Sequence, residues 1–335
     1  MIPSPYLLYL GDATDALSVK TARGIAQWRP DLAMGEISDA GGSISVGLAR
    51  LSLAEAAARG AQTLVIGFAN AGGRMSSATV ELVQAALRAG LHIASGLHQC
   101  LGDNDAIRQA AQESGRKLFD VRVPPSPIPV GSGAPRPGKR LLTVGTDCSV
   151  GKMYTALALE RELTKRGVAA SFKATGQTGI FIASGGVPVD ALVADFISGG
   201  VEQLTPGRDD EGWDLIEGQG SLFHPSYAGV SLGLLHGAQA HALVLCHQAG
   251  RERIRKLENY AVPRLTECLA RNLEAARLTN PAAQAVGVSV NTSGMDLQAA
   301  LAACRTIEDD LGLPCEDPLS MGVERIADRV LACAS

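Results

Sequence analysis

The sequence predicts an α/β protein with two domains, each built on a mostly parallel sheet. Three observations support this prediction. The chain has 335 residues, more than a single hydrophobic core usually serves. Short apolar strands alternate with helical segments, the order that parallel sheets with crossover helices require. Residues 124–139, six of which are proline, cannot form a helix or an interior strand and predict an extended linker between domains at 1–123 and 140–335.

Composition and charge exclude several function classes. Hydrophobic residues make up 46% of the chain and charged residues 19%, which excludes global disorder. A net charge of −4 and an aromatic content of 4% give neither the basic footprint nor the stacking surface of a nucleic-acid-binding protein. No apolar run reaches about 18 residues, so we expect no membrane contact. Seven dispersed cysteines without a CxxC pair, and an N-terminus without signal-peptide features, predict a cytoplasmic protein with no zinc site or disulfide framework.

The first domain shows the alternation of a Rossmann-like fold. We expect strands at 6–10, 63–66 and 91–94, and helices at 78–89 and 105–113. The glycine-rich turn Gly67–Gly73 lies where a doubly wound sheet binds ligands. It is not a GxGxxG motif and has no acidic residue placed to contact a ribose. Tight packing is therefore the alternative to nucleotide binding there.

The second domain begins with a strand at 140–144 that runs into a phosphate-binding loop. The loop is Gly145-Thr-Asp-Cys-Ser-Val-Gly151-Lys152, and helical spacing follows at 153–165. The backbone N–H groups of such a turn face one anion, and Lys152 adds a mobile positive charge. Its glycines are separated by five residues, one more than usual. The alternative is an ordinary glycine-rich turn with a surface lysine. Further strands are expected at 168–172, 215–216, 242–246 and 285–290.

The residue after the loop lysine argues against a catalytic Mg²⁺. A Ser or Thr normally ligates the metal there, but this chain has Met153. A thioether is a poor ligand for a hard cation. Thr155 is two residues further along the helix and faces another direction. We therefore expect no metal site, an inessential Mg²⁺, and a loop that binds a diphosphate without cleaving it.

The loop spacing and its Gly-Thr-Asp start resemble dethiobiotin synthetase. In the same order, Phe172-Lys173, the strand end at Glu217-Gly218, and Val288–Asn291 resemble that family's substrate-side lysine, Glu-Gly strand end and adenine-reading asparagine. Together with IGFANAGG, ASGLHQ, FKATGQTG, DLIEGQGSL and LCHQAGR, the whole chain resembles the D-glutamate N-acetyltransferase family. That resemblance implies transfer of the acetyl group of acetyl-CoA to the amine of D-glutamate or a related D-amino acid. We also expect a homo-oligomer, a common state for such folds.

On this interpretation the loop holds the diphosphate of coenzyme A. The expected contacts are Gly145, Thr146, Asp147, Cys148, Ser149, Val150, Gly151, Lys152, Met153 and Tyr154, with Asn291 at the adenine. The alternative for Asn291 is a turn residue at a strand end. Cys148 lies at a helix N-terminus, which favours a thiolate. An acyl-cysteine relay and a small loop-filling side chain are both open for it.

Acetyl transfer to an amine needs a general base, because the amine is protonated at neutral pH. Glu217, after an apolar strand, is expected to act as that base, to bind the ammonium, or to bind a cation. Lys173 and His224 are the other catalytic candidates. Substrate-binding candidates are Thr175, Gln177, Thr178, Gln219, Ser221, His247 and Arg251. The plainer alternatives are a surface lysine, structural histidines, and a solvated helix face that carries Arg251, Arg253, Arg255 and Lys256.

Two other functions remain open at this point. The resemblance to dethiobiotin synthetase allows an ATP-dependent ligase or kinase acting on a small carboxylate, although Met153 argues against it. The third possibility is a non-enzymatic nucleotide-binding regulator.

Overall fold

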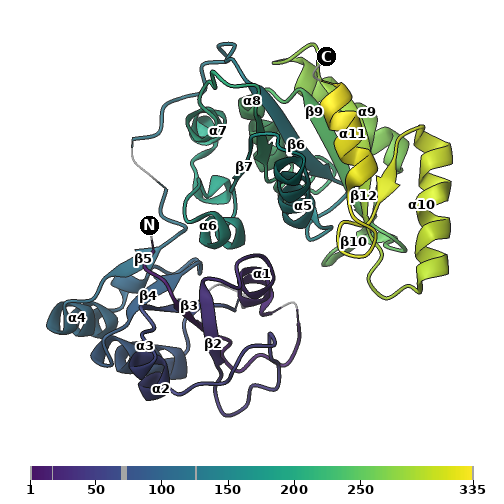
Figure 1. Cartoon of the computed structure of the whole chain (residues 1–335). Coiled ribbons are helices and arrows are strands. Elements are labelled where there is room, and N and C mark those ends of the chain that lie inside the picture. Colours follow the sequence, from purple (N-terminus) through teal and green to yellow (C-terminus); the bar gives the residue numbers. More distant parts are fainter. Residues whose placement is uncertain (1, 17, 69–73, 125–126, 334–335) are drawn as a thin grey trace. The chain divides into compact units, whose positions relative to one another are not determined.

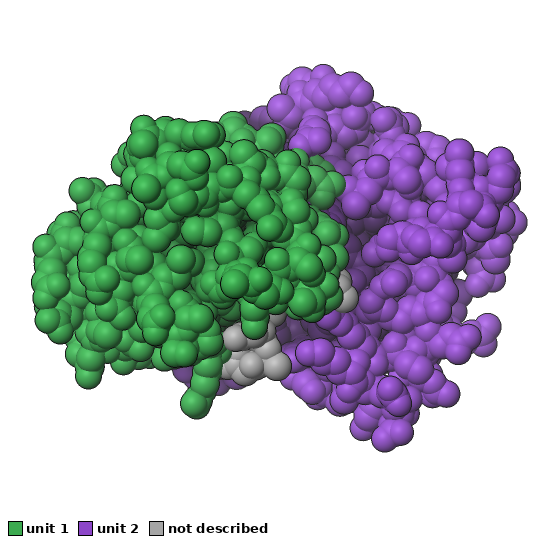
Figure 2. Space-filling model, turned by 90° about the horizontal axis from the view of Figure 1, so that it is seen from below, with its two compact units in different colours: residues 1–124, 177–188 green, residues 125–176, 189–335 purple. Residues whose placement is uncertain are grey.

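The computed structural model describes residues 2–16, 18–68, 74–124 and 127–333 (Figure 1). The chain divides into two compact units, coloured separately in Figure 2. Unit 1 comprises residues 1–124 and 177–188, and unit 2 comprises residues 125–176 and 189–335. The second unit therefore lacks a segment that the sequence assigned to the domain at 140–335.

Unit 1 is built on a five-stranded parallel sheet with the strand order β2-β1-β3-β4-β5. This arrangement confirms the expected Rossmann-like domain. Its central strands are buried along their whole length, which is why they read as continuous apolar runs. The strands are β1 (Tyr6–Tyr9), β2 (Ala33–Ile37), β3 (Thr63–Ile66), β4 (His92–Ser95) and β5 (Leu118–Asp120), and the helices are α1 (Lys20–Trp28), α2 (Leu53–Ala58), α3 (Ser77–Arg88) and α4 (Asp105–Ser114), with a 3-10 turn η1 (Leu101–Asp103).

The glycine-rich turn after β3 is only partly described. A Cβ on Gly67 would lie 2.6 Å from the Cβ of Ala22, so this glycine allows α1 to pack closely on the sheet. Residues 69–73 lie outside the described residues. Nucleotide binding by this turn therefore stays a prediction.

A short helix from the second half of the sequence completes unit 1. Helix α6 (Gln177–Ala183) packs against α1. The Oγ1 atoms of Thr178 and Thr21 are 3.0 Å apart, and Arg29 donates to the Ile182 carbonyl oxygen at 2.9 Å. Both partners come from positions about 150 residues earlier, so no local pattern could have indicated this exchange.

Unit 2 is built on a six-stranded parallel sheet with the order β13-β12-β9-β6-β8-β7. Helices α5 and α11 cover one face, while α8 and α9 cover the other (Figure 1). The strands are β6 (Lys139–Gly145), β7 (Ala170–Lys173), β8 (Trp213–Ile216), β9 (Ala242–Gln248), β12 (Gln284–Asn291) and β13 (Cys315–Glu316). The helices are α5 (Lys152–Lys165), α7 (Ile197–Leu204), α8 (Ala228–Ala238), α9 (Leu265–Arg277), α10 (Leu297–Leu311) and α11 (Glu324–Ala332), with 3-10 turns η2 (Val189–Ala191) and η3 (Ala194–Phe196).

An antiparallel hairpin replaces the solvated helix that was an alternative for Arg251 and its neighbours. It consists of β10 (Arg253–Ile254) and β11 (Leu257–Ala261), with Lys256 at φ +64° in the turn. The apolar residues Ile254, Leu257 and Tyr260 are three positions apart, a spacing that is compatible with a helix, but the segment pairs as a hairpin.

The predicted linker has no helix or strand over its described residues 127–138, but it is anchored to unit 2. The Glu202 carboxylate accepts from the backbone N–H groups of Ser132 and Gly133, each at 2.8 Å. Arg136 donates to the carbonyl oxygens of Thr205 at 2.9 Å and Gly237 at 2.8 Å. The segment is thus extended as expected, and α7 and the end of α8 supply partners for its backbone and side chains.

The parallel strands of unit 2 bring their carboxyl ends to one edge. That edge carries the loop after β6 and the residues that follow β7, β8, β9 and β12. Ligands of open parallel sheets bind at such an edge. Over the described part of the chain, no helix is long and apolar enough to cross a bilayer.

Candidate functional site

The phosphate-binding loop joins β6 to α5 and buries its lysine. Gly151, at φ +106°, makes the turn into the helix in a backbone conformation that a side chain would strain. Lys152 is 7% exposed, and its Nζ donates to the carbonyl oxygen of Asp147 at 2.8 Å. Burial lowers the pKa of Lys152, and the nearby Cys148 and Asp147 oppose this shift. The ammonium thus lies inside the loop, where a bound anion would replace the carbonyl as its partner.

The outside of the loop is held by an arginine and by the hairpin. The fully buried Asp147 carboxylate accepts from the Arg251 guanidinium at 2.8 Å and from the Arg255 backbone N–H at 2.7 Å. Its other oxygen accepts from the Cys148 N–H at 2.6 Å. Arg251 also donates to the Cys148 carbonyl oxygen, and the Arg255 side chain donates to Ser149 Oγ at 2.7 Å. Arg251, predicted to bind the acceptor carboxylate, is therefore engaged in holding the loop.

Glu217 follows β8 and lies buried at the same edge. It is 5% exposed, and one carboxylate oxygen accepts from the backbone N–H groups of Thr175 at 3.1 Å and Gly176 at 3.2 Å. Burial raises the pKa of Glu217 to about 7, although both N–H bonds and the Lys152 charge act in the opposite direction. A carboxyl with this pKa exchanges protons near neutral pH, as a general base must.

Close packing explains the glycine after Glu217. A Cβ on Gly218 would lie 1.6 Å from the Thr143 carbonyl oxygen and 2.9 Å from Cδ of the loop lysine. The glycine therefore lets the strand end pass against β6 and the lysine stem. Nearby, Gln219 donates to Thr175 Oγ1 at 3.2 Å, and that hydroxyl donates to the Glu217 carbonyl oxygen at 2.6 Å. The fold thus brings together three candidate site residues from the sequence: Thr175, Glu217 and Gln219.

Lys173, a catalytic candidate from the sequence, is paired with a buried aspartate. Its Nζ lies 3.4 Å from Oδ1 of Asp214, which also accepts from Arg208 at 2.8 Å. Asp214 is on β8 and is 2% exposed. Lys173 therefore helps to neutralise a buried aspartate, and its catalytic role stays a prediction.

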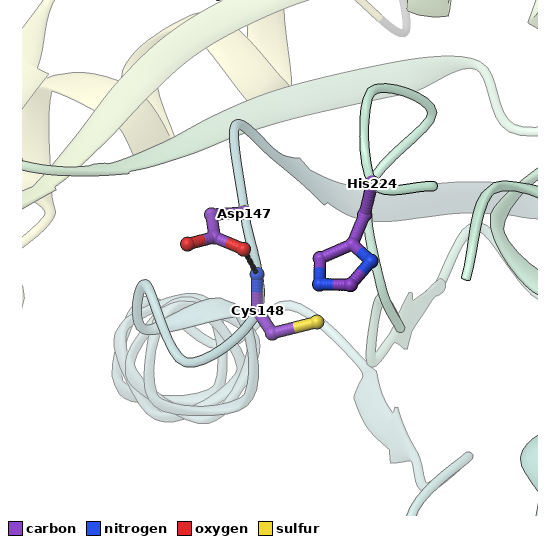
Figure 3. Close-up of side chains that lie close together, drawn as sticks. All are labelled: Asp147, Cys148 and His224. Atoms are coloured by element: carbon purple, nitrogen blue, oxygen red, sulfur yellow. Dashed lines mark hydrogen bonds between the residues drawn. The ribbon is translucent and has the colours of Figure 1, made fainter. Parts of the chain in front are cut away.

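His224 meets the loop from a distant segment of the chain. Potential ligand atoms of Asp147, Cys148 and His224 all lie within 4.8 Å of one another, and Figure 3 shows the Cys148 thiol directed toward the imidazole ring. His224 is 4% exposed, and its Nδ1 accepts from the Ser226 N–H at 3.2 Å. A neutral ring bound in this way carries its proton on Nε2. His224 is therefore arranged as a hydrogen-bond donor rather than as the expected base.

Most of the remaining candidate residues form hydrogen bonds to neighbouring residues around the site. Thr146 Oγ1 lies 3.0 Å from Nδ1 of His247, and burial lowers the pKa of His247 to about 4, so this ring is a weak base. The Asn291 side chain accepts from the Ser293 N–H at 2.9 Å, the turn role that was its alternative. Ser221 Oγ accepts in the same way from its own turn, while Val150 is buried and Met153 and Tyr154 are half-buried at the start of α5.

Gln177 and Thr178 do not join this group within unit 2. Both begin α6 and belong to unit 1, where Thr178 contacts Thr21 and Gln177 packs on Gly96. Sequence reasoning also missed Arg255 and Ser226, which act through backbone contacts that no motif indicates.

Thr155 does not replace the missing magnesium ligand. Its hydroxyl donates to the Gly151 carbonyl oxygen at 3.0 Å and lies 2.7 Å from Ser289 Oγ. The side chain is fully buried in these contacts. Met153 and Thr155 together leave the loop without the usual hydroxyl for Mg²⁺.

Comparison with known proteins agrees with this architecture. Residues 33–124 match the DUF1611_N Rossmann-like domain and residues 129–327 match the DUF1611_C P-loop domain. A protein of Tritonibacter scottomollicae named D-glutamate N-acetyltransferase is 50% identical over 99% of this chain and 100% of its own length. One of the same name from Pseudoalteromonas sp is 47% identical over 97% of this chain and 98% of its own.

A solved structure has the same fold over nearly the whole chain. The DUF1611 family protein of Anabaena variabilis superposes with a TM-score of 0.90 at 31% identity, covering 98% of this chain and 100% of that one. Identity and coverage at this level show common descent as well as a common fold. The chain belongs to the DUF1611 family, together with the curated D-glutamate N-acetyltransferases that match its full length.

Proposed function

We propose that this protein transfers the acetyl group of acetyl-CoA to the amine of D-glutamate. Its relatives of that name match it from end to end, so the whole catalytic unit is shared. The observation that carries the proposal within the structure is the buried Glu217, which follows β8 at the same sheet edge as the loop and interacts electrostatically with Lys152. An amine acceptor needs a proton acceptor with a pKa near neutrality, and Glu217 has one.

The charges at the loop fit a zwitterionic amino acid. Lys152 and the loop N–H groups offer a site for a carboxylate, and Glu217 offers one for an ammonium. A diphosphate in the loop would instead meet the Glu217 carboxylate without the Mg²⁺ that usually screens such a pair. Charge complementarity therefore favours the acceptor as the occupant of the loop.

The length of coenzyme A supports the same placement. The pantetheine arm joins the diphosphate to the thioester sulfur. An extended chain advances ~3.5 Å for every three backbone bonds, so the extended arm spans about 15 Å. If the diphosphate occupied the loop, an extended arm would carry the thioester away from Glu217. With the acceptor at the loop, the thioester can meet the amine there. If the loop instead holds the diphosphate, as the sequence predicted, removing the Lys152 ammonium should weaken the binding of coenzyme A rather than that of the acceptor. A Lys152 variant tests this difference.

In the proposed reaction, Glu217 takes one proton from the acceptor's ammonium. The free amine then attacks an acetyl thioester, the nitrogen loses its second proton, and the sulfur leaves. Holding the amine beside its base supplies both proximity and deprotonation.

The proposal is tested by following thiol release from acetyl-CoA with single acceptors. We expect release that depends on D-glutamate, with N-acetylglutamate identified by mass spectrometry in equal amount. L-Glutamate, D-aspartate and D-glutamine measure what the site requires in chirality, length and second carboxylate. Thiol release that is independent of every amino acid would overturn the proposed function.

The ATP-dependent alternative is tested in the same reaction. Replacement of acetyl-CoA by acetate, ATP and Mg²⁺ should give no N-acetyl product, because Met153 and the engaged Thr155 leave the loop without its metal hydroxyl. Product formed under those conditions would support a ligase instead.

A further inference from the structure

We infer that Cys148 is the nucleophile that first accepts the acetyl group from acetyl-CoA and then passes it to the acceptor amine, with His224 positioning its thiolate. This inference rests on the proposed acetyl transfer and assigns it a covalent intermediate.

The geometry brings a nucleophile and a donor together from separate segments. Cys148 belongs to the loop between β6 and α5, and His224 belongs to the turn before α8. Their sulfur and ring nitrogen lie within 4.8 Å, and the thiol is directed toward the ring in Figure 3. Catalytic hydrogen bonds are often long before substrates bind and then shorten.

His224 is fixed in one orientation. The ring is 4% exposed, its centroid lies 4.4 Å from that of Tyr227, and the Ser226 N–H binds its Nδ1. The proton on Nε2 is then available to the sulfur of Cys148. A neutral donor of this kind stabilises a thiolate without taking its proton.

The sulfur lies among charges of both signs, because the Asp147 carboxylate, which is paired with Arg251, is within 4.8 Å of it. The Lys152 ammonium interacts electrostatically with Cys148 and also with Glu217, so one cation lies near both the nucleophile and the base. Cys148 also precedes α5 by four residues, at the positive end of the helix. The lysine and the helix end attract a negative sulfur, and the pairing of Asp147 with Arg251 offsets the charge of that carboxylate.

A metal ion is a poorer explanation of the same three side chains. Both oxygens of Asp147 already accept hydrogen bonds, one from the Cys148 N–H and the other from Arg251 and Arg255. A guanidinium 2.8 Å from the carboxylate repels a cation there. Asp147 shapes the loop, which leaves Cys148 and His224 as the reactive pair.

Both half-reactions balance. In the first, the Cys148 thiolate attacks the thioester carbonyl, a new carbon–sulfur bond forms, and coenzyme A leaves as a thiolate that takes a proton from water. In the second, Glu217 takes one proton from the acceptor's ammonium, the amine attacks the S-acetyl group, the nitrogen loses its second proton to water, and the Cys148 thiolate leaves. Overall, acetyl-CoA and the ammonium give the amide, coenzyme A and one proton, with no oxidant or metal.

The experiment uses the full-length protein and acetyl-CoA without an acceptor. We expect a burst of coenzyme A that is stoichiometric with enzyme, and one acetyl group on the Cys148 peptide by mass spectrometry. Adding D-glutamate should discharge the label into N-acetylglutamate. Acetyl-pantetheine, which lacks the diphosphate, should also label Cys148. A wild-type enzyme that turns over but forms neither burst nor label would overturn the inference.

Matched variants separate the chemical role from a structural one. Cys148→Ala and the nearly isosteric Cys148→Ser should abolish the burst and lower turnover by ~10²-fold or more. The control Cys100→Ala, in unit 1, should behave as wild type. His224→Gln should shift the pH midpoint of Cys148 alkylation by iodoacetamide upward, which a packing role alone would not do. Full activity in Cys148→Ala would overturn the inference and leave the proposed function standing, whereas failure of the wild type to acetylate D-glutamate would remove the function itself.

Discussion

At the scale of single residues, the site holds a buried lysine and a buried carboxyl that interact electrostatically. Glu217 could be located from the sequence because an acidic residue directly after an apolar strand lies at the ligand-binding edge of a parallel sheet. Its raised pKa could not, because that depends on burial beneath backbone from another strand. For Arg251 and Lys173, the position in the sequence did not reveal the side chain's partner. Their buried partners, Asp147 and Asp214, are set by tertiary packing, and the chain pattern alone gave no sign of them.

Lys152→Met tests which substrate the loop holds. Removing the ammonium should raise KM for D-glutamate by roughly 10–150-fold, from the 1.5–3 kcal/mol of one charge-assisted hydrogen bond. Affinity for coenzyme A, measured by calorimetry, should remain unchanged. A weaker affinity for coenzyme A with an unchanged KM for the acceptor would instead place the diphosphate in the loop.

Glu217→Gln should stabilise the protein at alkaline pH. The folded pKa of about 7 lies above the ordinary 4.5, so the folded state holds an extra proton between these values. Stability contributed by this group is therefore full below pH 4.5 and is lost as pH rises to 7. Glutamine removes that loss, so the variant's Tm should exceed that of the wild type at pH 8 and match it near pH 4. A lower Tm at pH 8 would show that the ionised carboxylate is structurally required.

At the scale of elements, those with a regular hydrophobic pattern could be predicted, whereas those held by irregular tertiary contacts could not. Strands β6, β8 and β9 could be placed because they are short, mainly buried apolar runs, and α5 because it follows a loop motif. The two-residue strand β13 was not expected from the sequence. The hairpin at 253–261 could not be placed, since its pairing is short and it contacts the loop through the Arg255 N–H. Short elements that are held in place by tertiary contacts need no hydrophobic repeat, so the sequence does not indicate them.

Arg251→Met should destabilise unit 2 by about 3–5 kcal/mol, because it leaves the buried Asp147 carboxylate without its charged partner. Urea unfolding followed by circular dichroism measures the loss. Arg253→Met, an exposed arginine of the same segment, is the control and should change little. If the pair is responsible, adding Asp147→Asn to Arg251→Met should cost less than the sum of the two single variants.

At the scale of the whole molecule, the two units were predictable but their boundary was not. Alternating strands and helices on either side of a proline-rich segment indicate two parallel sheets. Helix α6 nevertheless belongs to unit 1, although it directly follows Thr175 and Gly176, whose N–H groups bind Glu217. The chain thus passes from unit 2 to unit 1 between Gly176 and Gln177.

The whole enzyme should function without a divalent cation. Treatment with EDTA, followed by gel filtration into metal-free buffer, should leave thiol release within about twofold of the untreated rate, because the usual Mg²⁺ hydroxyl is absent from the loop. Loss of activity that Mg²⁺ restores would contradict this account of the loop.

The most direct test of the account is the pH dependence of kcat/KM for D-glutamate in the wild type and in Glu217→Gln. We predict a wild-type rate that rises with pH through a midpoint near 7, where Glu217 becomes the carboxylate. In the variant that midpoint should disappear and kcat should fall by ~10²–10⁴, the usual contribution of a general base. A variant that keeps both the midpoint and the wild-type kcat would show that Glu217 does not take the proton.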